Sequence, residues 1–336
     1  MPIPLIPIIL GAAVGTSVAG YFKGNKAIEN NSKANDINEQ ARRLQDNITR
    51  KLQNARDKTK KQLENLGRKK LHVCEVTIGK FVMLYEIIKN INLSESNNIG
   101  ELDNFKIDNK NLNELKEINI LASSFTKESV ADAMTNSAIA FGAYSAARAF
   151  VHVSTGAAIT GFSSAATTNT TLAFLGGGAL AVSSMGMIGG MSILGSVVAG
   201  PALLAIGTIM GVKANQNLIN AYSNLSKVRE AEIEVNDLVA TCNEIANRAN
   251  LITSALDKLN IIVVPKINNL SRIIKEEGTD YSKYSATAHQ EITTLLSLIK
   301  VIKTILDTAI LTDEGALTEE SRSVLEAANQ TLAKFS

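Results

Sequence analysis

The stretch that decides the fold is VNDLVATCNEIANRANLITSALDKL, residues 235–259. Its apolar residues recur at alternating steps of three and four, and polar or charged residues fill the positions between them. This spacing places the apolar side chains on one face of an α-helix, as in the seam of a coiled coil or a long bundle. The seam residues are Leu238, Cys242, Ile245, Ala249, Ile252, Leu256 and Leu259.

The same spacing of apolar residues occurs in the N-terminal third and predicts a long helix from Lys26 to about Asn90. About 60 residues of helix would extend roughly 90 Å. Gly67 and Gly79 interrupt the pattern, so we expect bends there. The seam residues are Ile37, Ala41, Leu44, Ile48, Leu52, Ala55, Thr59, Leu63 and Leu66.

Other helices and turns follow from the same analysis. Residues 92–111 are polar and aperiodic, which predicts a loop before a helix that restarts near Leu112. Pro265 is expected to end or kink the helix that carries the 235–259 seam, because proline removes a backbone donor. Turns are predicted at 276–280 and 312–315. Two further helices carry Ile292, Leu295, Ile299, Ile302, Leu306 and Ala309, and then Leu317, Val324, Leu325 and Leu332.

Between the amphipathic parts lies a stretch of 64 residues, Ala149 to Val212, that contains no Asp, Glu, Lys or Arg. We call it the apolar stretch. Its part from Thr171 to Val212 is long enough for two passes through a bilayer, since one pass needs about 20 apolar residues. The residues expected to allow close helix packing or turning there are Gly176, Gly177, Gly178, Gly186, Gly190, Gly195, Gly200, Pro201, Gly207 and Gly211.

The predicted fold class is therefore all-α: an elongated helical bundle with long coiled-coil-like helices and a central glycine-rich apolar helical hairpin. Four parts are expected: an apolar N-terminal segment (1–24), the first part of the amphipathic body (25–132), a membrane-insertion region (133–212) and the second part of the body (213–336). Residues 1–24 begin without the basic residues of a secretory signal, which favours retention over cleavage. They fit either a membrane helix or a plug packed on the bundle.

Basic residues are concentrated between Arg42 and Lys70, where eleven of them accompany only three acidic residues. Such a run is usually a solvated helix face, but it can also attract anionic lipid headgroups or nucleic acid. No aromatic residues interleave with the run, so nucleic acid is not predicted as a partner. The residues predicted to contact acidic lipid are Arg50, Lys51, Arg56, Lys58, Lys60 and Lys61.

No catalytic chemistry is predicted from the sequence. His72, His152 and His289 are far apart and lack metal-ligand spacing, so neither a metal nor a cofactor is expected. Gly176, Gly177 and Gly178 lack the following Lys and Ser/Thr of a phosphate loop. Cys74 and Cys242 fall on apolar helix faces, which predicts buried free thiols, although a bridge between two helices stays open.

The order of parts resembles the α-helical pore-forming proteins of the cytolysin A and haemolysin BL type, and more loosely apolipoprotein L. The block Leu172-Ala-Phe-Leu-Gly-Gly-Gly-Ala-Leu-Ala181 is also similar to that of bacterial glycine-zipper proteins. This resemblance implies a soluble helical bundle that hides the hairpin and then inserts it into a membrane as a toxin or defence effector, as a homo-oligomer. It rests on architecture, without a diagnostic motif.

One departure from those families keeps a second hypothesis open. Their apolar heads are shorter, whereas the apolar stretch and residues 1–24 together could supply three or more spans. The alternative is a constitutively membrane-anchored coiled-coil scaffold or tether whose seams bind a helical partner or another copy. Membrane association is expected under both hypotheses. A soluble pool, cytoplasmic or secreted, is expected only for the pore-forming protein.

Overall fold

The computed structural model describes residues 19–91, 109–128, 138–139, 141–144, 218–312 and 315–335. In these ranges the regular elements are helices, and the two isolated bridges, Lys89–Asp280 and Leu311–Leu317, form no strand. The all-α fold class and the long helices are thus confirmed. The predicted hairpin and the ten residues expected to shape it lie outside the described residues.

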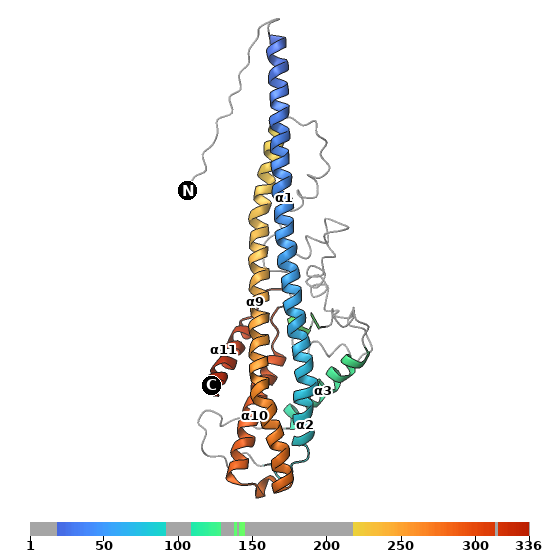
Figure 1. Cartoon of the computed structure of the whole chain (residues 1–336), viewed down its shortest axis with the longest axis vertical. Helices are drawn as coiled ribbons and strands as arrows, with labels where there is room; N and C mark the ends of the chain where they lie inside the picture. The colour runs from blue at the N-terminus through green and yellow to red at the C-terminus, as the bar shows by residue number, and fades with distance from the viewer. Residues whose placement is uncertain are drawn as a thin grey trace. The chain divides into compact units, whose positions relative to one another are not determined.

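The helices follow in chain order (Figure 1). They are α1 (Ala19–His72), the π-helix η1 (Val73–Ile78), α2 (Gly79–Tyr85), α3 (Asn109–Glu128), α9 (Leu218–Glu277), the 3-10 turn η4 (Tyr281–Lys283), α10 (Ala286–Asp307) and α11 (Glu319–Ala333). The long N-terminal helix was predicted correctly, except that six of its residues form a π-helix. The helix α3 starts three residues before the predicted position.

The chain divides into two compact units, the first comprising residues 1–48 and 201–233. In it, Asn224 on α9 donates a side-chain hydrogen bond to the Oδ1 of Asn38 on α1 at 3.3 Å. Small and branched apolar side chains fill its core. They are Ala34, Ile37 and Ala41 on α1, and Ala221, Leu225 and Val228 on α9.

The second unit comprises residues 49–200 and 234–336, and in it α1 and α9 run parallel. Thr59 Oγ1 donates to the carbonyl oxygen of Cys242 at 2.7 Å, and further along the Thr77 hydroxyl lies 2.6 Å from the Oδ1 of Asn260. The two pairs have the same sequence separation, 183 residues, so the helices advance together. Only a parallel pair gives that relation.

The predicted seams form the core of these helices. Every predicted seam residue of α9 is buried, and so is every one of α1 except the half-buried Leu44. On α10, Ile292, Leu295, Ile299, Ile302 and Leu306 are buried as predicted. Cys74 and Cys242 are buried free thiols, which confirms that prediction and leaves no bridge between them.

Pro265 does not end α9, so that part of the prediction was wrong, while the kink stays a prediction. The helix continues twelve residues further, to Glu277. Pro265 lies on the exposed face, while Val263, Ile267 and Leu270 around it are buried. Packing of that opposite face outweighs the loss of one backbone hydrogen bond, which is the usual way in which tertiary contacts override propensity.

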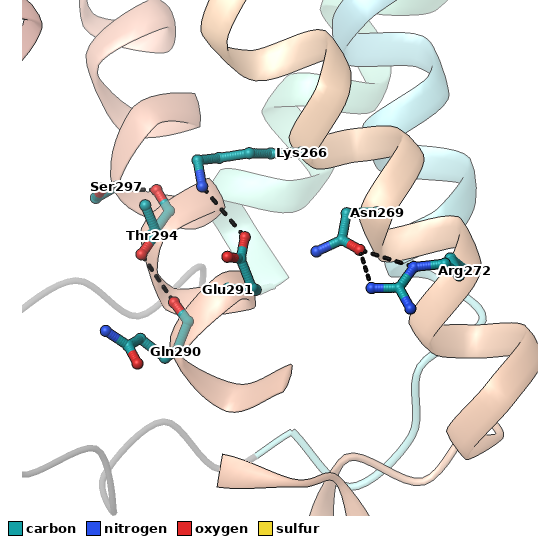
Figure 2. Close-up of polar contacts among 7 residues, drawn as sticks. All are labelled: Lys266, Asn269, Arg272, Gln290, Glu291, Thr294 and Ser297. Atoms are coloured by element: carbon teal, nitrogen blue, oxygen red, sulfur yellow. Dashed lines mark hydrogen bonds and ion pairs between the residues drawn. The ribbon is translucent and has the colours of Figure 1, made fainter. Parts of the chain in front are cut away.

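The chain reverses between α9 and α10 at the turn predicted for residues 276–280. Gly278 adopts a positive φ of 87°, a conformation that side chains with a Cβ rarely adopt. The Ser285 hydroxyl caps α10 by accepting from the amide of Ala288. Figure 2 shows how Lys266 of α9 reaches Glu291 of α10, with Nζ and Oε2 3.1 Å apart. This ion pair links α9 to α10.

The π-helix is stabilised by a side chain from α3. Asn119 Nδ2 donates to the carbonyl oxygens of Cys74 and Glu75, both at 3.0 Å. The amide fits because Gly79, where the π-helix ends, has no Cβ; a methyl group there would overlap Asn119. Gly79 therefore marks the return from π-helix to α-helix and the docking point of α3.

Candidate functional site

The most unusual packing in the second unit is where the chain approaches the apolar stretch. Residues 138–139 and 141–144, which we call the docked segment, are all buried. Only four residues separate Tyr144 from Ala149, the first residue of the apolar stretch. The docked segment therefore holds the chain on the helical body shortly before the apolar stretch begins.

A reciprocal glycine contact joins the docked segment to α1. A methyl group added to Gly67 would overlap the carbonyl group of Ala138, and one added to Gly142 would overlap the carbonyl of Leu63. Each glycine thus allows the other segment's backbone to approach without an intervening side chain. At Gly67 α1 continues, so this glycine serves close packing in an unbroken helix.

The second attachment is to the connection between α10 and α11. The carbonyl oxygen of Ala143 accepts two backbone hydrogen bonds, from Ile310 at 2.8 Å and from Leu311 at 3.1 Å. Ile310 and Leu311 have no exposed surface. Hydrogen bonds buried in this way lack competition from water, so their loss would leave polar groups unsatisfied in the core.

The third attachment is the ammonium group of Lys70, whose side chain is fully buried on α1. Its Nζ donates to the carbonyl oxygen of Thr308 at 3.2 Å and to that of Tyr144 at 3.4 Å. Thr308 caps the C-terminus of α10, where a positive charge is favourable. Nζ also lies 5.8 Å from the centre of the Phe141 ring. Lys70 thus connects α1, the docked segment and α10.

Burial lowers the pKa of Lys70 to about 8, while the nearby Cys74 and Asp307 oppose that shift. Asp307 is itself paired with Lys303 on the same helix at 2.6 Å. Burial also raises the pKa of the Cys74 thiol, which keeps that thiol protonated and unreactive. The third attachment therefore uses the charged form of Lys70, which burial disfavours.

The lowered pKa of Lys70 predicts that the free energy of unfolding depends on pH, and Lys70→Met should remove this contribution. The folded pKa of about 8 lies below the ordinary value of 10.5, so the unfolded chain binds more protons between these pH values. Stability contributed by this group consequently increases as the pH rises through that window. Between pH 7 and 9 the free energy of unfolding of the wild type should rise by about 1 kcal/mol relative to Lys70→Met, measured by urea denaturation. The titration of Cys74 in the unfolded chain is common to both proteins, so parallel pH profiles would contradict the prediction.

The cations predicted to contact lipid are not equivalent. Arg50, Lys51, Lys58 and Lys61 are exposed on α1, and Lys60 is half-buried. Arg56 has no exposed surface, and burial lowers its pKa. In this conformation a lipid surface could meet the other five residues but not Arg56, because Arg56 occupies the seam between Leu52 and Thr59.

The buried position of Lys70 and the close contact between Gly67 and Gly142 were not predicted from the sequence. A signal for Lys70 was present: it continues the steps of three and four from Leu63 and Leu66, so a charged residue stands at a seam position. Gly67 appeared only as an interruption of the pattern. No signal in the sequence indicated that the segment before the apolar stretch packs on Gly67.

No helix in the described ranges is both long and apolar enough to cross a bilayer. Those ranges also contain no cluster of three or more His, Cys, Asp or Glu side chains that could hold a metal ion. Comparisons with protein-family models, curated proteins and solved structures found no match to this chain.

Proposed function

We propose that the protein is a membrane-inserting, pore-forming protein of the helical type. Its body holds the apolar stretch in a water-compatible state and releases it on contact with a membrane. The observation that carries the proposal is the docked segment: a buried, glycine-dependent attachment lies four residues before a charge-free stretch long enough for two spans. Such a stretch must be covered either by protein or by lipid, because large exposed apolar surfaces are unfavourable.

The exposed cations of α1 supply the first membrane contact in this proposal. Each Lys or Arg that reaches an anionic surface contributes about 1 kcal/mol, roughly a fivefold gain in partitioning. Once the apolar stretch has inserted, Gly186, Gly190, Gly207 and Gly211 allow copies to pack closely, which leads to a homo-oligomer. The toxin, cell-death or defence-effector class is part of the proposal and rests on the resemblance of the order of parts to helical pore-forming proteins.

The scaffold alternative is less well supported by the helix seams. That hypothesis assigns the seams of 37–66 and 235–259 to a partner or another copy. In the described conformation the residues of both seams are almost entirely buried within the chain. A partner helix would first have to displace the chain's own helices.

The test is dye release from anionic vesicles, with neutral vesicles in parallel. The purified full chain should release dye from the anionic vesicles. Gly190→Asp should abolish release, since an Asp at the centre of a span costs about 3 kcal/mol. Asn250→Asp is the matched control because it adds the same charge at an exposed position of α9, and it should release dye like the wild type.

Two outcomes would contradict the proposal. One is release by Gly190→Asp at the wild-type rate, and the other is no release from anionic vesicles under any tested pH or salt condition. Carbonate extraction of cells that make the protein then identifies the alternative. A constitutive anchor stays entirely with the membrane pellet, whereas the pore-forming protein has a soluble pool.

A further inference from the structure

We propose that pore opening needs the apolar stretch to insert from its first residue, Ala149, and that undocking of the docked segment from α1 and from the α10–α11 connection controls this step. This inference rests on the proposed function and specifies its regulation. Three separate attachments meet at the docked segment: the Gly67–Gly142 contact, the two amides on the Ala143 carbonyl, and the Lys70 ammonium on the Tyr144 carbonyl. All three hold backbone atoms of the same short segment.

The position of the docked segment explains why undocking would act as a control. The apolar stretch begins five positions after Tyr144. Five residues of fully extended chain span about 17 Å. While Tyr144 stays attached at Lys70, chain length alone keeps Ala149 within about 17 Å of Tyr144. Insertion that includes Ala149 therefore requires either that the body lies on the membrane or that the docked segment leaves α1, whereas the part from Thr171 to Val212 begins 27 positions after Tyr144 and is not restrained in this way.

The attachments are also of a kind that can open as a unit. Two of them use main-chain atoms against main-chain atoms, and the third uses a buried cation whose burial is unfavourable. Undocking hydrates the Lys70 ammonium and the freed carbonyls, which offsets part of the lost packing. Contacts among the helices α1, α9 and α10, such as Thr59 with Cys242 and Lys266 with Glu291, involve no residue of the docked segment.

A reversible lock tests the inference. The variant Ala143→Cys with Leu311→Cys joins two residues whose backbones share a 3.1 Å hydrogen bond. Cys74 and Cys242 can stay in place because both are buried. The control, Thr77→Cys with Asn260→Cys, joins α9 to the π-helix at a pair whose side chains touch at 2.6 Å. Disulfide formation in each is verified by mass spectrometry before vesicles are added.

We expect the oxidised 143–311 lock to reduce dye release at least tenfold and reduction to restore it. The oxidised control should release dye at the wild-type rate. Equal release by the oxidised and reduced 143–311 variant would overturn the inference while leaving the proposed function intact. Equal inhibition by the control lock would also overturn it, because general stiffening would then suffice. If the reduced variants and the wild type all fail to release dye, the proposed function itself is wrong.

A loosening variant gives an independent measurement. Gly142→Ala should raise the rate of dye release about tenfold, because its methyl group overlaps the Leu63 carbonyl. In the absence of vesicles, the amides of Ile310 and Leu311 should exchange with deuterium about tenfold faster in this variant. Faster exchange without faster release would overturn the inference, since undocking would then not limit insertion.

Discussion

Gly67→Ala is expected to lower the free energy of unfolding by about 2 kcal/mol. In an exposed helix the same substitution would stabilise, since alanine is favoured over glycine by about 1 kcal/mol. Here the added methyl group overlaps the carbonyl of Ala138, and backbone cannot rotate aside as a side chain can. Overpacking of this kind typically costs 1–3 kcal/mol. Urea denaturation followed by circular dichroism measures the change.

Gly79→Ala is the matched control for that experiment. The atoms nearest to its methyl group belong to the Asn119 side chain, which can turn away and lose its two hydrogen bonds to the π-helix. The helix propensity gained by alanine offsets part of that loss, so we expect a change below about 1 kcal/mol. If Gly67→Ala were as stable as the wild type, the close contact between α1 and the docked segment would be refuted.

Pro265→Ala is expected to raise the free energy of unfolding by about 2 kcal/mol. A proline inside a helix is about 3 kcal/mol less favourable than alanine, and part of this is offset because proline also restricts the unfolded chain. Pro265 is exposed and lies within α9, so alanine adds a backbone donor without disturbing buried contacts. Thermal and urea denaturation should both shift towards greater stability.

The control for Pro265→Ala is Asn250→Ala, at another exposed position of the same helix. It should change stability by about 0.5 kcal/mol, the difference in helix propensity alone. An unchanged or lowered stability for Pro265→Ala would mean that the helix is broken at this residue in solution, as the sequence pattern had predicted.

The helices were predictable because their signal is local. The steps of three and four between Leu238, Cys242 and Ile245 place these residues on one helix face. That face becomes buried against any apolar neighbour, so its burial can be predicted without knowing which segment packs on it. The turn at 276–280 was likewise predictable, since a glycine at Gly278 suits a helix end. The hairpin predicted for the apolar stretch remains a prediction.

The candidate site was hidden because its partners are far apart in sequence. Lys70 lies 74 residues from Tyr144 and 238 from Thr308, and neither carbonyl oxygen belongs to a residue type that identifies an acceptor. The sequence also indicates which face of a helix is buried, but it does not indicate which segment packs on that face. It does not indicate in which direction a neighbouring helix runs either. The parallel direction of α1 and α9 follows only from pairs such as Thr59 with Cys242.

The attachment of the docked segment also depends on residues that the ribosome makes late. Ile310 and Leu311 follow Val212, the last residue of the apolar stretch, by about one hundred positions. At translation speeds of roughly 5–20 residues per second, the apolar stretch is complete about 5–20 s before the two amides that bind the Ala143 carbonyl are made. During synthesis, therefore, the docked segment exists for that time without the two amides that bind the Ala143 carbonyl in the finished protein.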